Sequence, residues 1–221
     1  MSRLFVFDVD STLLRVESLD FAVERALKRA KDGAKRAEAL KALTDQGMAG
    51  ELDFRQSLER RLEIAKLTEK QVSAAAEALA RETTPGMAAL LKRLRSKGDV
   101  AAVSGGFTDL IERALADLGF AASEIRANRF VFEAGRVSDF DRTNPLSRSG
   151  GKASVVAALK QQTGRNTAVM IGDGMTDYEA FSAGAADAFI GFGGIRRRDA
   201  VASRAPAYAD DVAALERLLL K

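Results

Sequence analysis

The sequence predicts an α/β fold, in which helices cover both faces of a parallel β-sheet and a separate helical segment is inserted. Three observations predict it. Short apolar runs alternate with helical patterns along most of the chain. Polar signatures follow these runs, at the edge where an open parallel sheet binds its ligands. Residues 15–82 interrupt the alternation. We therefore expect a doubly wound sheet with an inserted helical domain.

The first strand is expected over residues 3–9, because this apolar run reads as buried on both faces. Further strands are expected at three later apolar runs, residues 100–104, 167–171 and 187–191. Helical patterns extend over residues 84–98, 107–119, 151–164 and 210–221. Pro85 just inside the start and Gly98 just past the end bound the first of these helices. The later sequence RFVFEAGRVSDFD is expected to form a β-hairpin that turns at Ala134 and Gly135.

The interrupting stretch is rich in Ala, Glu, Lys and Arg, with helical spacing and no convincing strand. Its last helix is predicted to open with a capping box, in which Thr68 and Gln71 exchange hydrogen bonds. The predicted domains are therefore a helical cap, residues 15–82, and an α/β core, residues 1–14 and 83–221.

Composition restricts the chemistry that the chain can perform. The 221 residues include no His and no Cys, which excludes His- or Cys-ligated metals, Cys nucleophiles and Ser-His-Asp triads. No apolar run approaches the ~20 residues that a bilayer span needs, so we expect a cytoplasmic protein without membrane contact. A net charge of +3 favours anionic substrates and is weak evidence for a nucleic-acid partner.

Four aspartates at strand ends predict a site for a hard cation. Asp8 and Asp10 follow the first strand, and Asp173 and Asp177 follow the run at residues 167–171. Two like charges at the end of a buried strand repel each other, and burial raises the cost of ionising them. Asp is also common in strand-end turns, but a cation would compensate the repulsion. Mg²⁺ prefers such oxygen ligands and is the expected cofactor.

Donors for a bound phosphate come from two further signatures. Ser104, Gly105 and Gly106 follow the second expected strand, and Lys152 opens a helix after two glycines. Hydroxyl, backbone amide and ammonium groups all bind phosphoryl oxygens. Taken alone, the SGG segment could be a turn, and Lys152 could be a solvated lysine at a helix start.

Together these groups predict phosphoryl transfer. A carboxylate beside Mg²⁺ and a bound phosphoryl group can attack phosphorus and form an aspartyl-phosphate. A second carboxyl two residues further on can protonate the leaving oxygen and then activate water. We expect Asp8 and Asp10 to divide these roles between them.

These motifs, in this order, resemble those of the haloacid dehalogenase superfamily of phosphotransferases. The matches are DVDST, VSGG, Lys152 and GDGMTD. Within the superfamily, the chain resembles the phosphoserine phosphatase family from residue 3 to the C-terminal helix. The segments DVDSTLLRVESLD, GMAGELDFRQSLERRL and ANRFVFEAGRVSDFD carry this resemblance. It implies a Rossmann-like core, a helical cap, and hydrolysis of O-phospho-L-serine to L-serine and phosphate, the last step of serine biosynthesis.

The resemblance implies a role for each matched position in the core. Asp8 would be the nucleophile and a Mg²⁺ ligand. Asp10 would be the acid/base and would bind the metal through its carbonyl. Asp173 would be a metal ligand, and Asp177 would support the metal shell or Lys152.

Further positions would bind the substrate. Ser104 and Gly105, with Lys152, would hold the phosphoryl oxygens, and Glu17 and Arg61 would face the ammonium and carboxylate groups of the substrate. Met48 and Phe54 would line the lid over the site. Thr176 is also expected to touch the substrate.

Some of these positions have a plain structural alternative. From the residues alone, Arg61 would be a surface arginine beside a solvated helix face, and Met48 and Phe54 would be core residues. Thr176 could be a helix N-cap, with Glu179 completing a capping box.

Other functions fit the same sequence. A related phosphotransferase could pass the phosphoryl group to another acceptor such as homoserine, and a related phosphatase could act on another small phosphomonoester. A nucleic-acid-binding module could use the run Arg196–Arg198 and the Arg/Lys-rich cap helices. Without nucleic acid, this run would be solvated, with Arg198 able to reach a substrate carboxylate. No stacking aromatics lie near that run, which counts against nucleic acid. A catalytically inactive phosphate sensor is disfavoured because every catalytic position is filled. The oligomeric state does not follow from the sequence.

Overall fold

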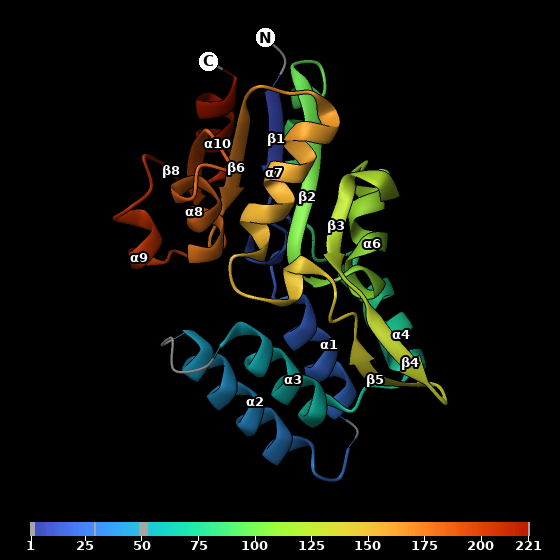
Figure 1. Cartoon of the computed structure of the whole chain (residues 1–221). Coiled ribbons are helices and arrows are strands. Elements are labelled where there is room, and N and C mark those ends of the chain that lie inside the picture. Colours follow the sequence, from blue (N-terminus) through green and yellow to red (C-terminus); the bar gives the residue numbers. More distant parts are fainter. Residues whose placement is uncertain (1–2, 29, 49–52, 221) are drawn as a thin grey trace.

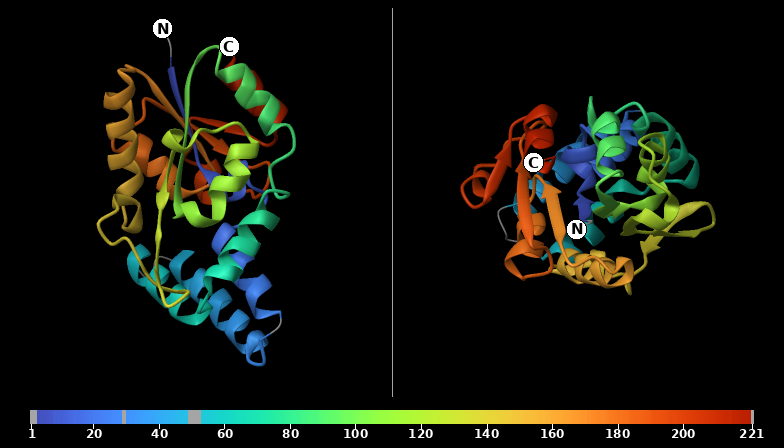
Figure 2. Two further views of the ribbon diagram at one scale, coloured as in Figure 1. Left: turned by 90° about the vertical axis from the view of Figure 1, so that its right-hand side faces the viewer. Right: turned by 90° about the horizontal axis from the view of Figure 1, so that it is seen from above.

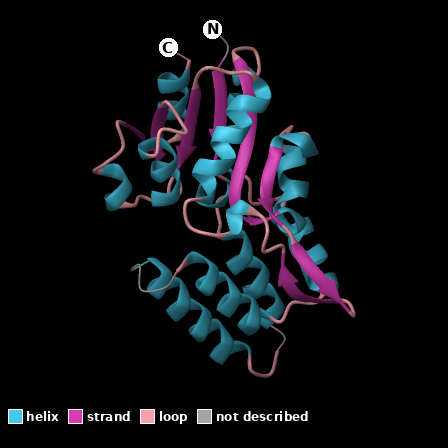
Figure 3. Cartoon of the chain, viewed as in Figure 1, coloured by secondary structure: helices cyan, strands magenta, loops and turns pink. Residues whose placement is uncertain are grey.

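The computed structural model of the chain describes residues 3–28, 30–48 and 53–220. Its described residues include a six-stranded parallel sheet in the order β3-β2-β1-β6-β7-β8 (Figures 1 and 3). The strands are β1 (Arg3–Phe7), β2 (Gly98–Phe107), β3 (Ile125–Asn128), β6 (Ala168–Gly172), β7 (Ala188–Phe192) and β8 (Ala207–Ala209). From β1 the chain proceeds through β2 to β3 at one edge, then crosses back to β6 on the other side of β1 and continues to β7 and β8. This is the doubly wound arrangement. The predicted fold class is confirmed.

The two edge strands, β3 and β8, were not predicted. They contain four and three residues respectively. A recognisable apolar run or alternation needs about four to eight residues. β8 is shorter than that, and β3 only reaches the minimum. They become strands because β2 and β7 each present a free edge with which they pair.

Each face of the sheet packs against its own set of helices. On β1, Leu4 and Val6 belong to a buried cluster with residues of α7 and α8, whereas Phe5 and Phe7 belong to another with residues of α5, α6 and α10. The left view of Figure 2 shows the sheet between these two layers. This alternation along one strand explains why the whole run is apolar, because both faces of a doubly wound sheet are covered.

The helices of the core are α5 (Met87–Leu94), α6 (Thr108–Asp117), α7 (Gly151–Thr163), α8 (Met175–Ser182), α9 (Asp199–Ala202) and α10 (Val212–Leu219). Helices α5, α6, α7 and α10 agree with the four predicted helical patterns to within a few residues. For α8 only a start near Thr176 was considered, and the four-residue α9 was not predicted. Among the described residues, no helix combines the length and apolar character that crossing a membrane requires.

The boundaries predicted for the helix over 84–98 are wrong at both ends. Pro85 lies before the helix, and Gly86, with a φ of 84°, immediately precedes its first residue. Gly98 is the first residue of β2 and pairs with Arg3 of β1. A Cβ at Gly98 would overlap the carbonyl oxygen of Arg3, so this glycine serves strand pairing and not helix termination.

The predicted hairpin is confirmed as strands β4 (Phe130–Glu133) and β5 (Arg136–Phe140). Its turn lies at Ala134 and Gly135, which have φ values of 47° and 73°. Positive φ at both central residues is typical of the two-residue turn that matches strand twist.

Residues 15–82 contain α1 (Ser18–Leu27), α2 (Gly33–Met48), α3 (Phe54–Ala65) and α4 (Glu69–Leu79). Helices α1, α2 and α3 lie beyond the carboxyl ends of the strands, at the end of the molecule opposite the two termini (Figure 1). Helix α4 packs along α6. The outgoing and returning chain segments lie side by side, because Leu14 forms an antiparallel bridge with Thr83. The predicted domain boundaries at these positions stay a prediction.

The structure confirms the predicted capping box at the start of α4. Replacing Thr68 by alanine tests its contribution to stability. The Thr68 backbone N donates to Gln71 Oε1 at 2.9 Å, and the Gln71 backbone N donates to Thr68 Oγ1 at 3.2 Å. We expect Thr68→Ala to lower the free energy of unfolding by about 1 kcal/mol in urea denaturation. Thr68→Ser, which keeps the hydroxyl, should change it little. Equal stability of wild type and Thr68→Ala would contradict the capping role.

Candidate active site

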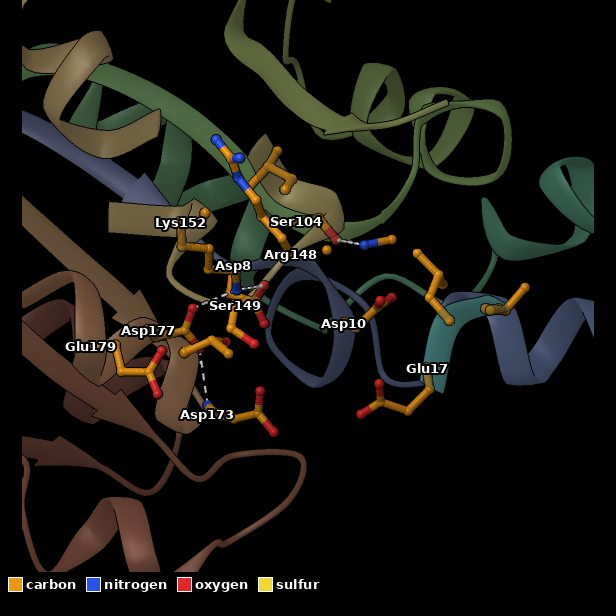
Figure 4. A pocket seen from close by; sticks show the side chains of 18 of the residues that line it. Asp8, Asp10, Glu17, Ser104, Arg148, Ser149, Lys152, Asp173, Asp177 and Glu179 are labelled. Atoms are coloured by element: carbon orange, nitrogen blue, oxygen red, sulfur yellow. Dashed lines mark hydrogen bonds and ion pairs between the residues drawn. The ribbon is translucent and has the colours of Figure 1, made fainter. Parts of the chain in front are cut away.

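A cavity of about 250 Å³ lies at the carboxyl ends of β1, β2 and β6, against α1 and α3 (Figure 4). Every predicted site residue whose side chain the structure describes lines it: Asp8, Asp10, Glu17, Arg61, Ser104, Gly105, Lys152, Asp173, Thr176 and Asp177. The side chains of Met48, at the end of α2, and Phe54, at the start of α3, lie outside the described part of the chain. The structure therefore brings together residues that are up to 169 positions apart, from Asp8 to Asp177.

Lys152, the second residue of α7, lies between two carboxylates. Its Nζ donates to Asp8 Oδ1 and to Asp177 Oδ1, each at 2.5 Å. All three side chains are at most 9% exposed. The Asp8 backbone N donates to the Ile171 carbonyl at 2.8 Å and thereby ties the end of β1 to β6. The alternative of a solvated helix-start lysine is wrong.

Burial dominates the electrostatics of these groups. It raises the pKa of Asp173 to about 6 and that of Asp10 to about 8, and neighbouring carboxylates add to the effect. Burial also raises the pKa values of Asp8 and Asp177, although Lys152 partly offsets this. Burial opposes the charge on Lys152, but the two aspartates outweigh it and raise the pKa of Lys152 above its ordinary value. The site therefore contains several carboxyl groups whose ionised forms are costly in this buried environment.

Three of these carboxylates fit a divalent metal ion. Asp8, Asp173 and Asp177 each offer an oxygen, and the three oxygens lie within 4.8 Å of one another. An all-oxygen set suits a hard cation, which would also offset the excess negative charge. The Asp10 side chain is not part of this cluster, and its predicted contact with the metal runs through the backbone carbonyl.

A tight loop after β1 turns Asp8 and Asp10 in different directions (Figure 4). Asp10 has an extended backbone, whereas Ser11 has a φ of 55°, in the left-handed region that non-glycine residues rarely adopt. Asp10 Oδ1 accepts a hydrogen bond from the Ser18 backbone N at 2.9 Å, at the start of α1. Ser11 Oγ donates to Glu17 Oε1 at 2.9 Å. The loop thus separates two carboxylates that are neighbours in sequence.

The SGG segment is the end of strand β2 and not a separate turn. The Gly106 backbone N donates to Ser104 Oγ at 2.8 Å, and Asn128 Nδ2 donates to the Gly105 carbonyl at 2.9 Å. A Cβ at Gly106 would lie 3.1 Å from Asp10 Oδ2. The absence of a side chain at Gly106 therefore lets the strand approach the Asp10 carboxylate closely.

Arg198, considered above only as the end of a solvated run that could reach a substrate carboxylate, lines the cavity. Its Nε donates to Asp173 Oδ2 at 2.7 Å, and its Nη2 donates to Glu17 Oε1 at 3.2 Å. Its side chain is 17% exposed, so it is not part of a solvated run, whereas Arg197 next to it is exposed and pairs with Asp210. No local pattern distinguishes the two arginines, because only the fold places β6 and α1 beside Arg198.

Arg61 lines the cavity and is not a surface arginine. Its side chain is 20% exposed and forms an ion pair with Asp20 of α1. Its neighbours Arg60 and Glu63 are exposed, as expected for the other face of α3.

The alternative of Thr176 as a helix N-cap is wrong. Gly174 precedes the first residue of α8, and Asp177 Oδ2 accepts a hydrogen bond from the Gly174 backbone N at 2.9 Å. The helix therefore begins earlier than expected, because the Asp177 carboxylate takes the capping role that was considered for Glu179. Thr176 is an exposed residue of the first turn and lies at the cavity.

Comparisons with known proteins agree with this geometry. Residues 5–182 match the family model described as haloacid dehalogenase-like hydrolase. Phosphoserine phosphatase from Homo sapiens is 35% identical over 207 residues, covering 93% of this chain and 88% of that protein. A phosphoserine phosphohydrolase-like protein from Francisella tularensis superposes with a TM-score of 0.86 at 28% identity, covering 99% of each chain. A phospho-aspartyl intermediate analogue of phosphoserine phosphatase gives 0.81 at 26% identity, covering 98% of each chain.

Divalent metal binding is expected to release protons and to weaken as the pH falls. Burial raises the pKa of Asp173 to about 6, so below that pH the metal-free site is increasingly protonated and protons compete with the cation. Calorimetric titration of the metal-free protein with MgCl₂ in buffers of different ionisation enthalpy would count the protons. The Asp173→Asn variant is the control, because it removes one of the three clustered carboxylates. Binding with an affinity independent of pH between about 5 and 8 would contradict this expectation.

Proposed function

Because the chain belongs to the haloacid dehalogenase-like hydrolase family, we propose that it hydrolyses O-phospho-L-serine to L-serine and phosphate. The observation that carries the proposal is one cavity that contains a buried Asp8–Lys152 pair together with Glu17 and Arg61. A carboxylate and a guanidinium are suited to the ammonium and carboxylate of an amino acid. The likeness to phosphoserine phosphatases over 93% of the chain supports the same substrate.

Asp8 is the proposed nucleophile. Lys152 Nζ holds Asp8 Oδ1 at 2.5 Å, which leaves Oδ2 to attack phosphorus. The new bond from Asp8 to phosphorus forms as the bond from phosphorus to the serine oxygen breaks, and an aspartyl-phosphate results. The Lys152 ammonium lies where it can stabilise the negative charge of the transferring phosphoryl oxygens.

Asp10 is the proposed general acid and base. Burial, with nearby Glu17 and Asp8, raises the pKa of Asp10 to about 8, which favours the protonated form that the first step needs. Asp10 then donates its proton to the departing serine oxygen. In the second step it accepts a proton from the water that attacks the aspartyl-phosphate, so that phosphate leaves and the Asp8 carboxylate is restored.

Ser104 and Gly105 are proposed to bind the phosphoryl oxygens beside Lys152. Ser104 is 1% exposed and lines the cavity at the end of β2. Asp177 is a positioning group in this scheme, because it accepts the second hydrogen bond of Lys152.

Mg²⁺ is the proposed metal, with Asp8, Asp173 and the backbone carbonyl of Asp10 as its ligands and Asp177 in support. When bound, the ion would supply positive charge that polarises a phosphoryl oxygen. Oxygen ligands alone, as in this cluster, suit Mg²⁺.

The substrate is proposed to be recognised by residues of the helical cap. Glu17 would bind its ammonium group and Arg61 its carboxylate, and Met48 and Phe54 would line the lid, with Thr176 at the cavity from the core side. In this proposal the cap comprises residues 15–82 and the core comprises residues 1–14 and 83–221. The paired segments at Leu14 and Thr83 support a boundary there.

The substrate assignment is tested by phosphate release from phosphoserine, phosphoethanolamine and glycerol phosphate, each with Mg²⁺ and with EDTA. Phosphoethanolamine keeps the ammonium group and lacks the carboxylate. Since a charge-assisted hydrogen bond contributes ~1.5–3 kcal/mol, kcat/KM should favour phosphoserine by about tenfold to a hundredfold. EDTA should abolish activity and Mg²⁺ should restore it. Equal activity on the three substrates would reduce the assignment to an unspecified phosphomonoesterase.

Substitution of the two aspartates tests the mechanism. Asp8→Asn keeps the shape of the side chain but removes the nucleophile, so turnover should vanish while substrate binding persists. Asp10→Asn should lower kcat by roughly 10²–10⁴-fold through loss of proton transfer. Beryllium fluoride should form an adduct on Asp8, visible by crystallography, and the exposed Asp210 provides a control as Asp210→Asn. Robust turnover by Asp8→Asn would refute an aspartyl-phosphate on this residue.

A further inference from the structure

The ion pair between Arg61 and Asp20 lies behind the wall of the cavity. Arg61 Nη2 donates to Asp20 Oδ1. Arg61 lines the cavity, but Asp20 does not. Both side chains are largely buried, with 20% and 28% of their surfaces exposed, so the pair is less screened than a surface salt bridge. Asp20 thus acts on the cavity only through the arginine.

Two carboxylates lie at the start of helix α1, one in the cavity and one behind its wall. Glu17 lies at the start of α1 and lines the cavity (Figure 4), and Asp20 follows three positions later. Residues three apart are neighbours on a helix surface. On α3, which packs against α1, Leu58 and Arg61 have the same spacing, and both line the cavity. Helix α1 therefore fixes the distance between Glu17 and Asp20, the residue that pairs with Arg61.

The ion pair leaves part of the guanidinium available. Arg61 Nε is buried and has no hydrogen-bond partner among the described residues, which is an unfavourable state for a donor. A planar guanidinium can bind one carboxylate with one edge while another nitrogen stays paired. Other carboxylates, those of Asp10 and Glu17, line the same cavity and would compete for an untethered arginine. In the structure Arg61 pairs with Asp20 instead.

We propose that Asp20 is a positioning residue for substrate selection, and this inference rests on the proposed function. By holding Arg61 at a fixed place relative to Glu17, Asp20 lets the two residues bind the carboxylate and the ammonium group of one α-amino acid at the same time. Its loss affects only substrates that carry the carboxylate, because only these use Arg61.

The test compares Asp20→Ala, Asp20→Asn, Arg61→Ala and the double variant Asp20→Ala/Arg61→Ala on phosphoserine and phosphoethanolamine. Asp20→Ala should lower kcat/KM for phosphoserine about tenfold, mainly through KM, and leave phosphoethanolamine nearly unchanged. Asp20→Asn keeps a hydrogen-bond acceptor at the same place and should retain part of the preference. The double variant should lose no more than Arg61→Ala alone, because the aspartate acts through the arginine. Glu24→Ala removes an exposed acid from the same helix and is the matched control.

Each outcome decides the proposal. A wild type that prefers phosphoserine while Asp20→Ala keeps the same preference would overturn the inference and leave the proposed function intact. Equal losses on both substrates, or a lower melting temperature that accounts for the loss, would show that Asp20 serves the fold and would overturn it too. Additive losses in the double variant would show that Asp20 does not act through Arg61. A wild type without activity on phosphoserine would overturn the proposed function and the inference together.

Discussion

The buried ammonium of Lys152 between Asp8 and Asp177 is the interaction on which the site depends. Carboxylates inside a protein are costly unless they are paired, and removing one partner of a buried ion pair leaves an uncompensated charge. Lys152 belongs to α7, Asp8 directly follows β1 and Asp177 belongs to α8. Both oxygen-to-nitrogen distances are 2.5 Å. The pairing therefore holds three elements together at one edge of the sheet. It leaves a surplus of negative charge beside Asp173, which suits a cation.

The backbone around the site is shaped by the close approach of these charged groups. Gly172 ends β6, and a Cβ there would overlap the Asp177 carboxylate. Gly106 ends the SGG segment, where a Cβ would crowd Asp10. Ser11 accepts a left-handed conformation so that Asp8 and Asp10 can point apart. Strain and small side chains of this kind are expected where a fold must keep several carboxylates near one point.

Near the start of α1, an arginine of the core lines the cavity and pairs with two carboxylates. Arg198 bridges Asp173, which belongs to the cluster of three carboxylates, and Glu17, the residue before α1. Arg198 therefore connects Asp173, which is proposed to bind the metal ion, with Glu17, which is proposed to bind the ammonium group of the substrate. Both partners carry negative charge, so one arginine lowers the repulsion on both sides of the cavity. The charges of the site are thus balanced across elements and not within any one of them.

The sequence by itself determined the doubly wound core, the hairpin at Ala134, the capping box at Thr68 and the polar groups at the strand ends, whereas Glu17 and Arg61 followed only from the family resemblance. It could do so because local periodicity and turn chemistry are encoded within a few residues, and because the carboxyl ends of parallel strands must converge. Only the tertiary structure decided that Arg198, and not Arg197, enters the site, that Asp20 holds Arg61, and that Gly98 pairs with Arg3. These outcomes depend on contacts between segments far apart in the chain. The free energies of such contacts are not encoded in any local sequence pattern.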